Sequence, residues 1–125
     1  MHGLPHDTDL SFLAGRYLDG VCFEQGRLSL FFEASLLNKK GTDIYVQSKV
    51  IHHSKNGVIE WDCTKTLADS CSLLMLFRIT ILRGAGMPDG TLKLEFSNEE
   101  VVTIPVGNQK EESYRICDGD TIIVV

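Results

Sequence analysis

The stretch DGTLKLEF, residues 89–96, decides the fold because it leaves a turn and then alternates apolar with polar side chains. This alternation is typical of a strand buried on one side, here the side of Leu92, Leu94 and Phe96. The stretch QGRLSLFF, residues 25–32, repeats the same pattern 64 residues earlier. The sequence therefore predicts that one structural unit occurs twice.

The predicted repeat extends beyond these two strands. The positions that match at the same offset are Gly20 with Gly84, Gly26 with Gly90, Leu28 with Leu92, Leu30 with Leu94, and Phe32 with Phe96. Each copy is expected to begin with a short helical stretch, at 9–14 and about 70–77, and to continue into four strands. We therefore expect a single domain over residues 1–125, built from repeats at about 9–62 and 70–125.

The remaining segments complete the expected architecture. Their patterns predict a turn at Asn56-Gly57 and further strands at 44–53, 58–62, 101–104, 113–117 and 121–125. The helix near 70–77 carries Leu73, Leu74, Leu76 and Phe77 around much of its circumference, which predicts a buried helix at the centre of the core. The expected fold is α+β, mainly β, with antiparallel strands.

Composition indicates an ordinary soluble globular chain, with 43% apolar and 23% charged residues. The first ten residues lack the pattern of an export signal, and no apolar run is long enough to span a membrane, so a cytoplasmic protein is expected. Four cysteines, Cys22, Cys63, Cys71 and Cys117, have neither metal-binding nor secreted-framework spacing. They are expected to be free thiols, with structural disulfides as the alternative.

The charge of the chain is unevenly distributed. Residues 1–88 hold nine acidic and nine basic side chains, whereas residues 89–125 hold eight acidic and three basic ones, so this last part supplies the whole net charge of -5. Phosphate binding requires Lys and Arg, so the pattern excludes direct nucleic-acid binding and favours a basic protein partner. The predicted partner-binding residues are Glu99, Glu100, Glu111, Glu112, Tyr114, Asp118 and Asp120. The loop at 36–41 is a further candidate anchor, and a solvated acidic face is the alternative interpretation.

The sequence contains no recognisable catalytic, metal or cofactor motif. His52 and His53 are adjacent, and successive side chains of a strand point to opposite faces, so the two cannot converge on one metal ion. Cys63 and Cys71 lack any local signature of a nucleophile. The glycine-rich segment 84–90 runs from strand to strand and is interpreted as a hairpin turn, because its spacing does not fit a phosphate-binding loop.

Several features between residues 77 and 116 follow one another in a recognisable order. They are Arg78-Ile79 before a strand, the turn Asp89-Gly90, the strand LKLEF at 92–96, Ile104-Pro105 at a strand end, and ESYRI at 112–116. This segment resembles a family of small bacterial domains of uncharacterised function. It departs from the family pattern at SNEE, residues 97–100, where a glycine turn is usual, and at Tyr114, where Trp is common. The resemblance implies a fold and carries over no catalytic residue.

These observations together favour a non-enzymatic domain that binds another protein. A small acidic domain without catalytic signatures resembles, by type, bacterial immunity proteins that bind and neutralise a cognate toxin, frequently a basic nuclease. One alternative is a small enzyme with a cleft between the repeats, using His52, His53, Cys63 or the acidic pairs. Another is a structural module that forms homodimers through an exposed sheet edge.

Overall fold

The computed structural model describes residues 9–24, 26–33, 41–63, 76–77, 79–107, 112–119 and 121–125. Within these residues the chain forms one short 3-10 helix, η1 at Ser11–Leu13, and ten strands. The strands are β1 Leu18–Glu24, β2 Arg27–Phe32, β3 Thr42–Val46, β4 Lys49–Ser54, β5 Gly57–Asp62, β6 Ile81–Gly86, β7 Leu92–Phe96, β8 Val101–Ile104, β9 Tyr114–Asp118 and β10 Thr121–Val124. No helix in this part of the chain is long and apolar enough to cross a membrane.

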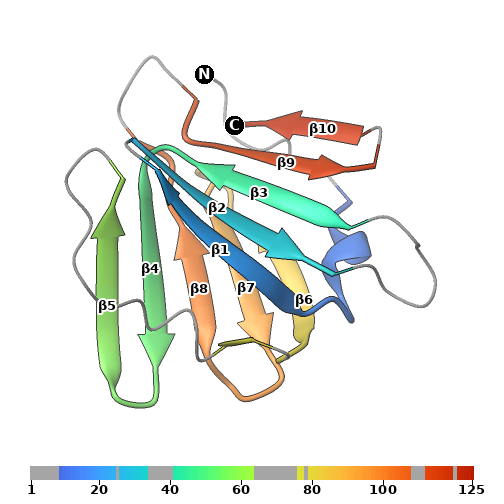
Figure 1. Cartoon of the computed structure of the whole chain (residues 1–125), viewed down its shortest axis with the longest axis vertical. Coiled ribbons are helices and arrows are strands. Elements are labelled where there is room, and N and C mark those ends of the chain that lie inside the picture. Colours follow the sequence, from blue (N-terminus) through green and yellow to red (C-terminus); the bar gives the residue numbers. More distant parts are fainter. Residues whose placement is uncertain are drawn as a thin grey trace.

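The strands form two five-stranded antiparallel sheets, with β1 and β2 lying across β7 and β8 in Figure 1. The first sheet has the order β1-β2-β3-β9-β10, and the second has the order β5-β4-β8-β7-β6. Each sheet contains three successive strands from one half of the chain and two from the other half. Neither sheet is built from one half alone.

The two strand orders are related in a simple way. Each strand of the first half corresponds to the strand numbered five higher in the second half, so that β1 corresponds to β6 and β5 to β10. When corresponding strands are exchanged, the order of the first sheet becomes β6-β7-β8-β4-β5. This is the order of the second sheet read from β6 to β5. The corresponding edge strands β1 and β6 each carry a register shift near their first residues. The shift lies between Leu18 and Gly20 in β1 and between Ile81 and Arg83 in β6. This is the topology expected if two copies of one β unit exchange their last two strands.

The exchange occurs at Gln47 and Ser48, where the predicted strand 44–53 is divided into β3 and β4. The chain leaves the first sheet after Val46 and enters the second at Lys49. The Ser48 hydroxyl donates to the carbonyl oxygens of Pro105, at 3.0 Å, and of Ser113, at 3.4 Å. The prediction of one continuous strand is therefore wrong. The inward alternation continues across the break, from Ile44 and Val46 to Val50, so the sequence pattern gives no sign of it.

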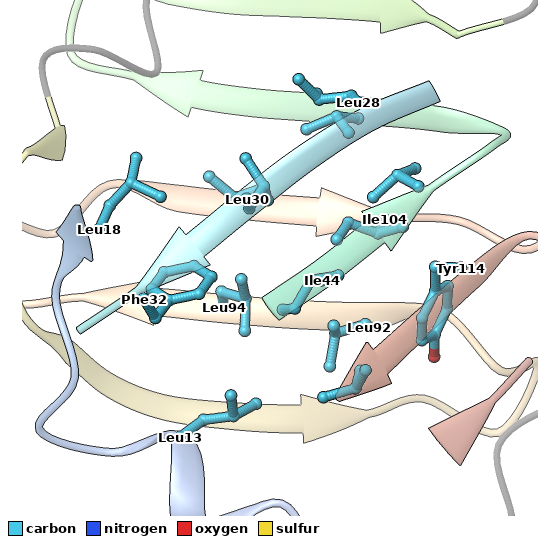
Figure 2. Packing of buried hydrophobic residues seen from close by; sticks show 14 of the residues in the cluster. Leu13, Leu18, Leu28, Leu30, Phe32, Ile44, Leu92, Leu94, Ile104 and Tyr114 are labelled. Atoms are coloured by element: carbon cyan, nitrogen blue, oxygen red, sulfur yellow. The ribbon is translucent and has the colours of Figure 1, made fainter. Parts of the chain in front are cut away.

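The inner faces of both sheets contribute to a single hydrophobic core (Figure 2). Leu28, Leu30 and Phe32 of β2 are buried, and their matched residues Leu92, Leu94 and Phe96 of β7 are buried as well. The two quoted strands thus occupy equivalent places in opposite sheets, as the central members of β1-β2-β3 and β6-β7-β8. The predicted strands at 92–96 and 101–104 are confirmed.

The predicted α+β class is wrong, because the described residues form a nearly all-β structure and hold no central buried helix. Residues 70–75 of the predicted helix lie outside the described residues. Leu76 is buried in the core between the sheets, while Phe77 is partly exposed and bridges to Leu18 at the start of β1. In the described part of the chain, side chains from the two sheets fill the space that the sequence assigns to a helix.

Candidate functional site

The predicted acidic surface does not form as one patch among the described residues. Glu99 and Glu100 lie in the turn between β7 and β8, in the second sheet, whereas Glu112 and Asp118 lie at opposite ends of β9, in the first sheet. Glu111, Asp120 and residues 34–40 of the predicted loop lie outside the described residues. The prediction that the carboxylates gather on one outward side is therefore wrong for the four that the structure describes.

Asp118 points toward the interior and binds a buried cation. Its Oδ1 atom lies 2.8 Å from Nη2 of Arg16, a side chain with no exposed surface, and accepts a hydrogen bond of 2.6 Å from the Thr42 hydroxyl. Arg16 also donates through Nε to the carbonyl oxygen of Phe12 at 2.9 Å and through Nη1 to that of Glu33 at 3.3 Å. This buried pair joins the segment around η1 to the ends of β2, β3 and β9. Asp118 therefore has a structural role.

Glu100 is likewise bound inside the molecule. One of its carboxylate oxygens lies 2.6 Å from Nε2 of His52, whose side chain is fully buried on the inner face of β4. His53, the next residue, is exposed on the outer face. The prediction that the two imidazoles point to opposite sides is confirmed. Within the core, the Glu100 carboxylate gives the buried His52 a polar partner.

Tyr114 cannot serve as an exposed anchor, because it is fully buried. Its hydroxyl donates a hydrogen bond of 2.7 Å to the carbonyl oxygen of Gly90, and burial raises the pKa of the phenol. Glu112 is mostly buried and binds Arg115 at 3.0 Å and Gln47 at 3.4 Å. Of the described acidic candidates, Glu99 alone is exposed, and it occupies the left-handed region with φ of 72°.

The outer face of the first sheet carries an aromatic cluster instead. The rings of Phe31 on β2 and Tyr45 on β3 meet edge to face, with centroids 6.4 Å apart. The guanidinium of Arg27 lies over the Tyr45 ring, 5.1 Å from its centroid. Phe31 alternates with the buried Leu30 and Phe32, so its ring is directed away from the core. An aromatic pair with a stacked arginine is the side-chain chemistry enriched in the buried centres of protein interfaces.

The same face continues across β9 to the edge strand β10. The register places Tyr45 opposite Arg115, and Arg115 opposite Val124. In the neighbouring row, Cys117 lies opposite Ile122, which is 60% exposed. We call this set the aromatic face; its residues are Arg27, Phe31, Tyr45, Arg115, Cys117, Ile122 and Val124.

Three polar atoms beneath or within the aromatic face are buried and have no hydrogen-bond partner. They are the Nε atoms of Arg27 and Arg115 and the hydroxyl of Ser29. Tyr45 links all three, since it lies opposite both Ser29 and Arg115 in the sheet and stacks on Arg27. Buried polar groups normally have a partner in protein or in ordered water, so each of these three donors is able to take a further acceptor.

Other candidate chemistry is not assembled in the described residues. Within them no group of three or more His, Cys, Asp and Glu side chains could hold a metal ion. Cys22, Cys63 and Cys117 are free thiols, and burial raises the pKa of Cys63 to about 11, which lowers its nucleophilicity at neutral pH. Cys71 lies outside the described residues. A shallow hollow of about 450 Å³ beside the β6–β7 turn is lined by Met87, Pro88, Asp89, Thr91, Lys93 and Thr103.

Comparisons with known proteins add no further assignment. No family model matches the chain, and neither a curated protein nor a solved structure matches it. The sequence interpretation missed the aromatic face, although a signal for it was present. Phe31 and Tyr45 occupy the outward positions of two half-buried strands, where polar residues are the rule, and large apolar side chains at such positions are informative.

Proposed function

We propose that the protein is a non-enzymatic domain that binds another protein through the aromatic face. One observation carries this proposal: around Tyr45, a partly exposed aromatic pair, a stacked arginine and adjacent polar donors share a single sheet surface. Tyrosine and arginine are the side chains most often responsible for binding energy in protein interfaces. The rigid sheet beneath them keeps the entropy loss on binding small.

The chemistry of the face specifies what the partner offers. Arg27 and Arg115 each use one nitrogen on a neighbouring carboxylate, Glu24 at 2.7 Å and Glu112 at 3.0 Å, and retain further donors. A partner loop with carbonyl or carboxylate oxygens would satisfy the two Nε atoms and the Ser29 hydroxyl, while apolar partner side chains would cover Phe31 and Ile122. This surface replaces the acidic one, because Glu100, Tyr114 and Asp118 are engaged within the fold.

Neutralisation of a bacterial toxin stays our proposal for the biological setting of this binding. Its support is the small size of the domain and its net charge of -5. The setting predicts that the gene immediately upstream encodes a large protein whose C-terminal domain is toxic. That domain would bind this chain and lose its activity in the complex.

The decisive experiment is a binding measurement between the purified chain and that C-terminal domain by isothermal titration calorimetry. We expect Arg115→Ala and Tyr45→Ala to weaken binding by about tenfold or more each, the loss typical of central interface residues. Lys93→Ala is the matched control, because Lys93 has 41% of its side chain exposed against 43% for Arg115 and lies on the outer face of the other sheet. Equal affinities for all four proteins would contradict the proposal.

A further inference from the structure

The two sheets formed by the described residues have four edge strands, and three of these carry features that oppose pairing with another chain. β1 and β6 each have an irregular register near their start, and they bear the charged residues Asp19 and Glu24 in β1 and Arg83 in β6. Backbone hydrogen bonds from Gly15 to Ile81 and from Ile81 to Arg16 also cover the beginning of β6. β5 carries Glu60 and Asp62. Bulges, charges and covering segments are the usual protection of a sheet edge.

β10 lacks these features. Its residues, Thr121-Ile122-Ile123-Val124, are uncharged, β-branched and in continuous register with β9. Ile122 is 60% exposed and Val124 is 40% exposed. Among the described residues, β9 is the only strand that pairs with β10. An apolar, regular and unprotected edge is a template for pairing with a further strand.

The hydrogen bonds at the end of β10 show which of its backbone groups are available. Val125 and Tyr114 exchange two bonds, of 3.0 and 3.3 Å, so they are a hydrogen-bonded pair. In an antiparallel ladder such pairs alternate with pairs whose backbone groups point away from each other. The N–H and C=O groups of Ile122 and Val124 therefore point away from β9, toward the open edge.

We infer that β10 pairs antiparallel with β10 of a second copy of this chain. With Ile123 opposite the partner's Ile123, each Ile122 lies opposite the partner's Val124, and the outward backbone groups of both residues meet. Side chains remain on matching faces in this register, because opposite residues of paired strands share a face. A second copy fits better than a charged strand, since twofold pairing is self-complementary and this strand places no like charges opposite each other.

The dimer would make one continuous sheet from the two first sheets and would join the two aromatic faces. Its outer surface would run from Tyr45 and Arg115 through Val124 to the partner's Ile122 and Cys117. The proposal goes beyond binding of a heterologous partner, because it concerns the edge of the sheet and not the centre of the aromatic face.

Sedimentation velocity of the full chain over a range of concentrations tests the inference. We expect the unmodified chain to dimerise and Ile122→Lys to raise the dissociation constant by at least about tenfold, because the substitution places like charges beside the twofold axis. Leu82→Lys is the matched control: Leu82 is 62% exposed on the edge strand β6, and its replacement should leave dimerisation unchanged. A monomeric unmodified chain would overturn the inference. So would a dimer whose dissociation constant is unchanged by Ile122→Lys, or is raised as much by Leu82→Lys as by Ile122→Lys.

A crosslinking variant tests the register. Ile123→Cys places two thiols opposite each other in a non-hydrogen-bonded pair, where the Cα atoms are about 4.5 Å apart and a disulfide can form. We expect rapid covalent dimer formation on mild oxidation, and much slower crosslinking of the unmodified chain under the same conditions. Equal crosslinking of both proteins would contradict the register. These readouts require no heterologous partner, so their failure is separable from failure of the proposed binding function.

Discussion

Arg16 and Asp118, 102 positions apart in the sequence, form a buried ion pair of 2.8 Å in which the guanidinium has no exposed surface. Replacement of Asp118 by Asn removes the negative charge that lies 2.8 Å from this buried cation. We expect Asp118→Asn to lower the free energy of unfolding by about 3 kcal/mol, measured by urea denaturation. The removal of one partner from a buried pair is costly because the remaining charge stays desolvated.

An exposed pair provides the control for this prediction. Glu24 and Arg27 lie at 2.7 Å with about half of each side chain in solvent, so Glu24→Gln should cost less than about 1 kcal/mol. The double variant Arg16→Met with Asp118→Leu should recover most of the loss, because an apolar pair of similar size needs no counter-charge. Equal losses for Asp118→Asn and Glu24→Gln would show that the buried pair has no special role.

The hydrogen bond from Tyr114 to Gly90 connects β9 of the first sheet to the turn before β7 of the second. Tyr114→Phe leaves the Gly90 carbonyl oxygen without this donor in the core, and we expect a loss of about 1–2 kcal/mol in the free energy of unfolding. Tyr45→Phe is the control, because the Tyr45 hydroxyl lies 3.2 Å from Asp43 on the outer face and its loss should cost under about 0.5 kcal/mol. Similar losses in the free energy of unfolding for Tyr114→Phe and Tyr45→Phe would contradict a stabilising role of the hydrogen bond between Tyr114 and Gly90.

The buried thiol of Cys63 should make the protein less stable at alkaline pH. Burial raises its pKa from 9.0 to about 11, so the unfolded chain releases this proton at a lower pH than the folded one. Stability from this thiol is complete below pH 9.0 and is lost as the pH rises toward 11, by about 1.4 kcal/mol for each pH unit at most. The free energy of unfolding of the unmodified chain and of Cys63→Ala should be measured by denaturation across this pH window, and it should fall less with pH in the variant. Equal falls in both proteins would contradict the raised pKa of Cys63.

Gly84 permits η1 to pack directly on β6. A Cβ atom at this position would lie 2.5 Å from Cδ1 and 3.2 Å from Cβ of Leu13, which is fully buried. We expect Gly84→Ala to lower the free energy of unfolding by about 1–3 kcal/mol, because the buried Leu13 side chain must shift to make room for the added Cβ atom. The repeat provides the control at Gly20, where the nearest atom of Phe31 is 3.3 Å away and the ring can adjust. Gly20→Ala should therefore cost less, as judged by thermal unfolding of the two variants.

Alternation in the sequence was sufficient to predict the strands that surround the core. The matched segments 25–32 and 89–96 became β2 and β7, with their apolar residues buried as expected. Alternation could not predict the division of 44–53 between two sheets, because Val46 and Val50 both point inward, one in each sheet. It also could not exclude a helix near 70–77. A short apolar run around Leu76 satisfies a buried position in either class of fold.

The prediction of an acidic surface was wrong for a different physical reason. A sequence gives the position of a charge along the chain, whereas exposure depends on partners that folding brings near. Arg16 and His52 lie in the first half of the chain, and each binds a carboxylate of the second half, Asp118 and Glu100. The aromatic face is the converse case, since its members are spread over β2, β3, β9 and β10 and become adjacent only through sheet order.

The strand exchange at Gln47 and Ser48 also bears on cooperativity. Each sheet contains strands from both halves of the chain. If the chain were divided between β5 and β6, each half would therefore hold only part of each sheet. Neither half can persist as a folded intermediate while the other melts. The molecule should therefore unfold in one all-or-none transition despite its duplicated pattern, and two separately produced halves should gain order only when mixed.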